Sequence, residues 1–153
     1  MANYICRPDA TAKVRGVAVP CLSGQVRFYQ ERDRVLVVAE ISGLPRDSET
    51  GFFALHIHEG GSCGGTAFSE TGGHYNPATE EHPAHAGDLP PLLSCGGTAY
   101  LAVRTNRFRV EDVIGRTVVI HSGADDFHSQ PAGNAGTKIG CGLVVKCSCP
   151  QRQ

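Results

Sequence analysis

The chain has 153 residues and a formal net charge of −1, and 41% of its residues are apolar and 19% charged. This composition excludes a disordered or collagen-like chain, and the length matches one domain, so we expect residues 1–153 to form a single domain. The balanced charge gives no reason to expect nucleic acid or an anionic membrane surface as a partner. No apolar run approaches the roughly 20 residues that span a bilayer, so no membrane association is expected.

Short segments of alternating or β-branched residues, separated by turn residues, predict strands along much of the chain. In chain order they lie at residues 11–17, 22–30, 35–41, 52–58, 98–103, 116–121 and 141–146. No window has the period of a long amphipathic helix, and only about one helical turn is expected, near residues 110–114. Many short strands of this kind indicate an all-β antiparallel sandwich or barrel.

Two connections, residues 59–97 and 122–138, contain little strand pattern. Loops longer than about 12–15 residues in a compact domain are usually functional. These two hold most of the glycines and prolines, so we interpret them as functional loops.

The N-terminal sequence lacks the basic and then apolar build of a secretory signal. The compartment therefore stays open: cytoplasmic for the chain as it stands, or extracytoplasmic if a signal has been removed. The seven cysteines are an odd number, so at least one thiol has no partner within the chain.

A pair of histidines on a predicted strand indicates metal binding. His56 and His58 are two residues apart, so both imidazoles project from one face of the strand while Ile57 points to the other. Their Cα atoms are expected to be roughly 6.5–7 Å apart, which suits two ligands of one ion.

The first long loop carries a second set of candidate ligands: His74, His82, His85 and Asp88. Their steps of eight, three and three residues, with glycine and proline between them, let the loop fold around a small cation. Three imidazoles and one carboxylate form a closed tetrahedral set that is typical of structural zinc.

His121 ends another apolar predicted strand and can approach the face of His56 and His58. Such an imidazole-rich site suits copper. If one histidine serves both sites, it has to be a bridging imidazolate, and His74, the first of its loop, is the candidate.

Six segments, in this order, resemble the copper/zinc superoxide dismutases. They read LHIHEGGSC, GGHYNP, HPAHAGDL, IGRTVVIH, DD and GNAGTKIGCG, and the resemblance runs from about residue 22 to residue 145. It implies an eight-stranded Greek-key β-barrel, a flattened sandwich with two long functional loops. It also implies disproportionation of superoxide to oxygen and hydrogen peroxide by alternate reduction and reoxidation of copper.

The resemblance also implies roles for individual residues. Asp125 matches a carboxylate that joins a copper histidine, His56, to a zinc histidine, His82, and Cys63 and Cys141 match a disulfide within the subunit. His74 is implied to be the catalytic proton carrier. The implied copper ligands are His56, His58, His74 and His121, and the implied zinc ligands are His74, His82, His85 and Asp88. A homodimer and a copper donor protein are further implied partners.

Lys138 stands where the family usually has an arginine, beside the expected copper site. Lysine keeps the positive charge that attracts superoxide, but it lacks the rigid two-pronged donor set of arginine. We therefore predict a catalytic cation at this position, and an active enzyme that steers superoxide more weakly than its arginine-bearing relatives.

Two alternatives remain: a non-catalytic metal carrier on the same barrel, and a structural sandwich held together by zinc. Lys138 and the C-terminal Cys147 and Cys149 favour the carrier, because thiolates at this spacing select Cu(I). The presence of all four candidate copper ligands argues against both alternatives. For the two C-terminal cysteines we favour exposed thiols or a disulfide to Cys6, Cys21 or Cys95.

Overall fold

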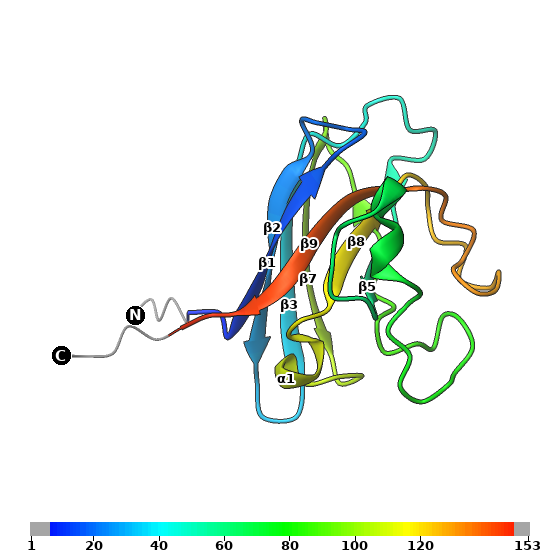
Figure 1. Ribbon diagram of the computed structural model, residues 1–153. Coiled ribbons are helices and arrows are strands. Elements are labelled where there is room, and N and C mark those ends of the chain that lie inside the picture. Colours follow the sequence, from blue (N-terminus) through cyan, green and yellow to red (C-terminus); the bar gives the residue numbers. More distant parts are fainter. Residues whose placement is uncertain (1–6, 149–153) are drawn as a thin grey trace.

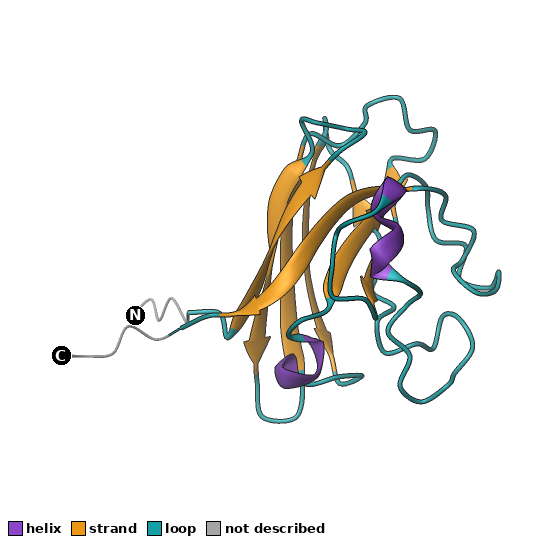
Figure 2. Ribbon diagram, viewed as in Figure 1, coloured by secondary structure: helices purple, strands orange, loops and turns teal. Residues whose placement is uncertain are grey.

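The computed structural model describes residues 7–148, and strands make up most of its regular structure (Figure 1). The strands are β1 (Ala10–Gly16), β2 (Ser23–Gln30), β3 (Val35–Ser42), β4 (Phe52–Phe53), β5 (Leu55–His58), β6 (Leu92–Leu93), β7 (Thr98–Thr105), β8 (Thr117–His121) and β9 (Lys138–Lys146). A one-turn helix, α1 (Val110–Val113), and a 3-10 segment, η1 (Thr66–Thr71), complete the described elements. The long loops gather on the side of the molecule where β5 and β8 lie (Figure 2).

Seven strands form one antiparallel sheet in the order β5-β8-β9-β1-β2-β3-β7, and β4 pairs with β6. Strand β6 packs beside β7, while β4 continues through Ala54 into β5. The two edges of the large sheet are thereby joined, with β4 and β5 acting as one interrupted strand. The fold is an eight-stranded antiparallel barrel with β9 inserted between β1 and β8, and the predicted Greek-key β-barrel is confirmed.

The core follows from the two-residue period of the strands. Alternate side chains of β1, β2 and β3 point inward, and among them Val26, Phe28 and Val37 are fully buried. Phe28 meets Phe108 edge to face, with ring centroids 6.4 Å apart. Burying an aromatic side chain of this kind contributes about 1.5–3 kcal/mol. The barrel is therefore a packed scaffold from which the loops can position polar groups.

The sequence-based strands agree with the structure to within three residues at their ends, with two differences: β9 begins at Lys138 and not at Cys141, and at residues 52–58 one predicted strand is two. The break lies at Ala54, whose N–H donates to Gly123 O (2.8 Å) and whose carbonyl accepts from His121 N–H (3.0 Å). Residues before the break pair with β6 and residues after it pair with β8. This change of partner is a tertiary effect that the hydrophobic pattern does not encode.

Two elements inside the first long loop were not predicted. Strand β6 has only two residues and follows Pro90 and Pro91, so it has no readable alternation. The η1 segment is irregular, because Ala67 and Phe68 have positive φ values of 51° and 59°. The predicted single turn near residues 110–114 is confirmed as α1.

A disulfide between Cys63 and Cys141 fixes the first long loop to β9. Phe68 of η1 packs beside it, against Val119 and Cys141. Between residues 7 and 148, no helix is long and apolar enough to cross a membrane.

Candidate metal centre

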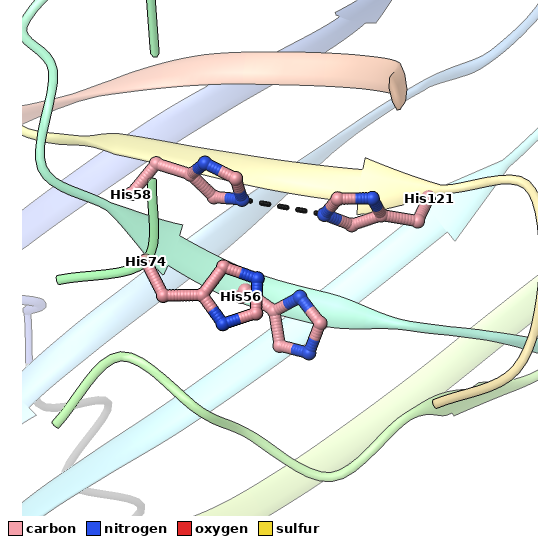
Figure 3. A group of neighbouring side chains, drawn as sticks. All are labelled: His56, His58, His74 and His121. Atoms are coloured by element: carbon pink, nitrogen blue, oxygen red, sulfur yellow. Dashed lines mark hydrogen bonds between the residues drawn. The ribbon is translucent and has the colours of Figure 1, made fainter. Parts of the chain in front are cut away.

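Two strands and one loop bring the first set of histidines together. His56 and His58 lie on β5, His121 ends β8, and β5 pairs with β8. Ile57 points into the apolar core, as the strand period predicts, while the two histidines face the loops. His74 reaches them from the first long loop, where it forms a β-bridge with His58 (Figure 3).

The first long loop runs along the free edge of β5. The Ile57 N–H donates to Gly87 O (2.9 Å), and Ile57 O accepts from Tyr75 N–H (2.8 Å). Asp88 forms a further β-bridge with His56. The loop therefore completes the hydrogen bonding of β5 and places its own side chains beside those of the strand.

The first cluster consists of four buried histidines that each offer one ring nitrogen, and these four nitrogens lie within 4.8 Å of one another: His56, His58, His74 and His121. The Nδ1–H of His58 donates to Gly72 O (2.9 Å) and that of His121 donates to Gly136 O (3.3 Å). Both neutral rings therefore present an Nε2 without hydrogen, and these two atoms are 3.2 Å apart (Figure 3). Facing lone pairs repel each other, so the geometry fits a cation between them.

The second cluster is built around the carboxylate of Asp88. Its Oδ1 lies 2.7 Å from His74 Nδ1, and its Oδ2 lies 3.1 Å from His82 Nδ1 and 3.2 Å from His85 Nδ1. The Nδ1 atoms of His74 and His85 are themselves 3.3 Å apart. Three imidazoles and one carboxylate, all buried, converge on one point. This is the donor set of a closed four-coordinate zinc site.

His74 belongs to both clusters. Its Nδ1 faces Asp88, whereas its Nε2 is buried and has no hydrogen-bond partner among the described residues. The His74 ring lies 4.0 Å from the ring of His56 and 4.9 Å from that of His58, measured between centroids. One imidazole therefore offers a nitrogen to each of two adjacent sites.

The carboxylate of Asp125 forms a hydrogen bond with one histidine of each cluster. Its Oδ2 accepts from His56 Nε2–H and its Oδ1 accepts from His82 Nε2–H, both at 2.8 Å. These bonds fix the tautomers and leave Nδ1 of both histidines without hydrogen. Both Nδ1 atoms are buried and have no hydrogen-bond partner within residues 7–148. Because an orphaned buried polar atom costs about 1–3 kcal/mol, these atoms are explained best as ligands.

Gly133 makes this arrangement possible. It has a positive φ of 69°, and a Cβ at this position would lie 2.1 Å from Asp125 Oδ1 and 2.6 Å from His82 Nε2. Only glycine therefore lets the backbone of the second long loop approach the hydrogen bond between Asp125 and His82 this closely.

Burial determines the charge state of three histidines of the first cluster. It lowers the pKa of His56 and of His58 to about 2 and the pKa of His121 to about 4. Burial alone would raise the pKa of Asp88, but its hydrogen bond with His74 and the nearby imidazoles lower it overall. These histidines of the first cluster are neutral and Asp88 is ionised near pH 7, which are the forms that bind metals.

Lys138 lies at the edge of the first cluster, opposite His121 in the strand register. Its Nζ donates to Thr71 Oγ1 (2.7 Å) and to Gly72 O (3.1 Å), and Gly72 O also accepts from His58. The Gly72 carbonyl thus accepts hydrogen bonds from both the Lys138 ammonium and the His58 ring. Partial burial lowers the pKa of Lys138.

The structure brings all the predicted site residues into one region, and it adds residues that the sequence analysis missed. The main-chain carbonyls of Gly72 and Gly136 contact the candidate ligands His58 and His121, and the side chain of Thr71 contacts Lys138. Of these, only the glycine pair before His74 carried a signal in the sequence. Cys21 and Cys95 are exposed, Cys147 is half-buried, and none of the three has a disulfide partner within residues 7–148, while Cys6 and Cys149 lie outside the described residues.

The fold and the site define a class of protein: an antiparallel β-barrel metalloprotein with two adjacent ligand clusters that share one histidine. Residues 22–144 match the family model of copper/zinc superoxide dismutase. The chain therefore belongs to the copper/zinc superoxide dismutase family. It is an oxidoreductase with copper and zinc as its cofactors.

Curated relatives are found in bacteria and in an animal. The superoxide dismutase (Cu-Zn) 1 of Aquifex aeolicus is 34% identical over 139 residues, which cover 79% of this chain and 79% of the relative. The superoxide dismutase (Cu-Zn) of Deinococcus radiodurans is 35% identical over 157 residues, covering 88% of this chain and 79% of the relative. The extracellular superoxide dismutase (Cu-Zn) of Rattus norvegicus is 32% identical over 153 residues, covering 93% of this chain and 62% of the relative.

Proposed function

We propose that the protein disproportionates superoxide to oxygen and hydrogen peroxide at a paired metal centre bridged by His74. The single observation that carries this assignment is the placement of the two His74 nitrogens, one in each cluster. The residues proposed to hold copper are His56, His58, His74 and His121, and those proposed to hold zinc are His74, His82, His85 and Asp88.

Copper, when bound, supplies the one-electron chemistry that lets superoxide be both oxidised and reduced, while zinc has no redox chemistry. The chain's own residues position the substrate and handle protons. The net reaction converts two superoxide anions and two protons to one oxygen and one hydrogen peroxide. His74 Nε2 is buried, has no hydrogen-bond partner in the described part of the chain and faces the first cluster, so it is suited to hold and release a proton there.

Two further residues act on the substrate or on the ligands. The ammonium of Lys138 attracts the superoxide anion toward the first cluster. The carboxylate of Asp125 keeps the rings of His56 and His82 in the tautomer that ligates through Nδ1. Asp125 acts as a positioning residue and has no contact with the substrate in this proposal.

Metal analysis combined with a superoxide-dependent assay tests the proposal. We expect the protein to bind copper and zinc in equal amounts, and superoxide consumption to require copper. The variant His74→Gln should still bind copper through the other three histidines, but with weaker zinc binding and a large loss of turnover. Bound copper without turnover would instead support a metal carrier, and zinc as the only bound metal would support a structural sandwich.

We also propose that residues 1–153 form one superoxide dismutase domain, that the protein is a homodimer, and that it receives copper from a donor protein. In support of a dimer, Leu143 and Val145 lie on the same outer face of β9 and are 40% and 46% exposed. Sedimentation equilibrium of the wild type and of Leu143→Ser tests the dimer. A monomer at all concentrations in the wild type would exclude it.

A further inference from the structure

The side chain of Gln130 forms two hydrogen bonds with the main chain of His82, which lies 48 positions earlier in the chain. The His82 N–H donates to Gln130 Oε1 (2.9 Å), and Gln130 Nε2 donates to His82 O (2.8 Å). The primary amide imitates a neighbouring β-strand, because it accepts from one backbone group and donates to the other. A carboxylate lacks the donor for this pairing and an ammonium lacks the acceptor.

The same loop also holds the ring of His82, because Asp125 Oδ1 accepts from His82 Nε2–H (2.8 Å). His82 is thus fixed at its main chain by Gln130 and at its imidazole by Asp125. The remaining ring nitrogen, Nδ1, stays directed at Asp88 Oδ2, 3.1 Å away. Both contacts come from the second long loop, whereas His82 belongs to the first.

Gln130 lies within a turn that is closed by its own hydrogen bonds. The Asp126 carboxylate accepts from the main-chain N–H groups of His128 (3.0 Å) and Ser129 (2.8 Å). The main-chain N–H of Asp126 donates to Gly133 O (3.0 Å). The Gly133 N–H in turn donates to Ser129 O (2.7 Å). Residues 126–133 therefore form a small preformed unit, which Gln130 connects to His82.

We propose that Gln130 is a positioning residue for the second metal cluster and couples metal binding at His82 to the order of the turn at residues 126–133. The proposal rests on the proposed role of His82 as a zinc ligand. A fixed backbone at His82 lowers the cost of bringing its ring to the ion, so Gln130 increases metal affinity. By linkage, metal binding must stabilise the contact between Gln130 and His82 to the same extent.

Two substitutions isolate the contact. Gln130→Glu keeps the size of the side chain and its acceptor but places an oxygen opposite His82 O, and Gln130→Ala removes both hydrogen bonds. The matched control is Gln25→Glu, because Gln25 is exposed on β2 and lies outside both long loops. Far-ultraviolet circular dichroism of the metal-free proteins verifies that all variants fold.

The probe is Co²⁺ alone, added to metal-free protein without copper and followed by its visible absorption, with Zn²⁺ competition for affinity. We expect about tenfold weaker binding for both Gln130 variants, in line with the usual effect of residues that orient ligands. We also expect a changed Co²⁺ spectrum, and no change for Gln25→Glu. In hydrogen exchange, Co²⁺ should protect residues 126–133 in the wild type and much less in the Gln130 variants.

Unchanged affinity and spectrum in both Gln130 variants would overturn the positioning role. Weaker binding with undiminished protection of residues 126–133 would overturn the coupling. A wild type that binds neither Co²⁺ nor Zn²⁺ would instead refute the proposed function, so the two failures are distinguishable.

Discussion

The Nε2 atoms of His58 and His121 face each other at 3.2 Å, and the other nitrogen of each ring is committed to a carbonyl. Neither neutral ring can donate a hydrogen bond to the other in this geometry, since each presents an Nε2 without hydrogen. The folded chain therefore maintains an unfavourable contact in the absence of a cation. That contact is a cost of preorganising the site, and a cation bound between the two atoms removes it.

The metal-free protein should lose stability as the pH falls from about 6.5 to about 4. Burial lowers the pKa of His56 and His58 to about 2 and that of His121 to about 4, from 6.5 in the unfolded chain. Between these values the unfolded chain binds more protons, so the free energy of unfolding decreases by about 1.4 kcal/mol per pH unit for each histidine. Urea unfolding at several pH values measures this dependence.

A matched control for the acid effect is His128→Gln, because the His128 side chain is 79% exposed and belongs to neither cluster. This variant should show the same pH dependence as the wild type. A urea midpoint that stays constant across the window would contradict the burial of neutral histidines.

Asp125→Asn should weaken the binding of both metals by about 10–100-fold. The carboxylate accepts hydrogen bonds from His56 and His82 at once, whereas an amide has one acceptor and would turn its NH₂ group toward one of the rings. That ring must then carry its proton on Nδ1, where it can no longer ligate. Competition with chelators of known affinity measures the loss for copper and zinc separately.

For the Asp125 prediction, the exposed Asp33 provides the control, because Asp33→Asn changes the same net charge away from the site. Equal affinities in Asp125→Asn and Asp33→Asn would show that the link between the clusters does not govern metal binding.

Lys138→Arg should raise the rate of superoxide consumption at low salt. Arginine offers a rigid set of donors where lysine offers a point charge, and this difference matters for orienting a small anion. Lys138→Gln should lower the rate and reduce its dependence on ionic strength. Initial rates between about 10 and 200 mM salt, with metal content measured for each variant, test both statements. A rate for Lys138→Arg equal to or below that of the wild type would count against weaker steering by lysine.

Cys63→Ser should lower the free energy of unfolding by about 2–5 kcal/mol, because the disulfide closes a long loop between residues 63 and 141. The substitution should also disturb the first cluster. The segment that the disulfide holds runs from Cys63 to Gly72, whose carbonyl contacts both His58 and Lys138. Denaturant unfolding measures the stability, and Cys21→Ser is the control because Cys21 is exposed and has no disulfide partner among the described residues. Wild type and Cys63→Ser with equal stability under oxidising conditions would refute the prediction.

Much of the fold was predictable because barrel strands have a two-residue period that the sequence displays directly. The alternation around Val26 and Phe28 and the β-branched run at residues 35–41 correspond to β2 and β3. The change of partner at Ala54 was not predictable, because it depends on backbone contacts with Gly123 and His121. Such contacts depend on the whole chain and leave no local pattern.

The convergence of the candidate ligands was predictable because three histidines and an aspartate at short spacings in one loop are typical of a metal site. The groups that support these ligands were not predictable. Gln130 and Thr71 act through single polar side chains whose partners lie 48 and 67 positions away in the chain. The carbonyl of Gly136 carries no side-chain signal at all. These contacts follow from the folded geometry alone.

The hydrogen bonds between the first long loop and β5 have a consequence for solubility. Gly87 and Tyr75 occupy the backbone groups of Ile57 that face away from β8, so the loop that carries the ligands also caps a sheet edge. A strand edge left open is a template for pairing with another molecule. Keeping the metal sites assembled thus also guards this chain against edge-to-edge aggregation.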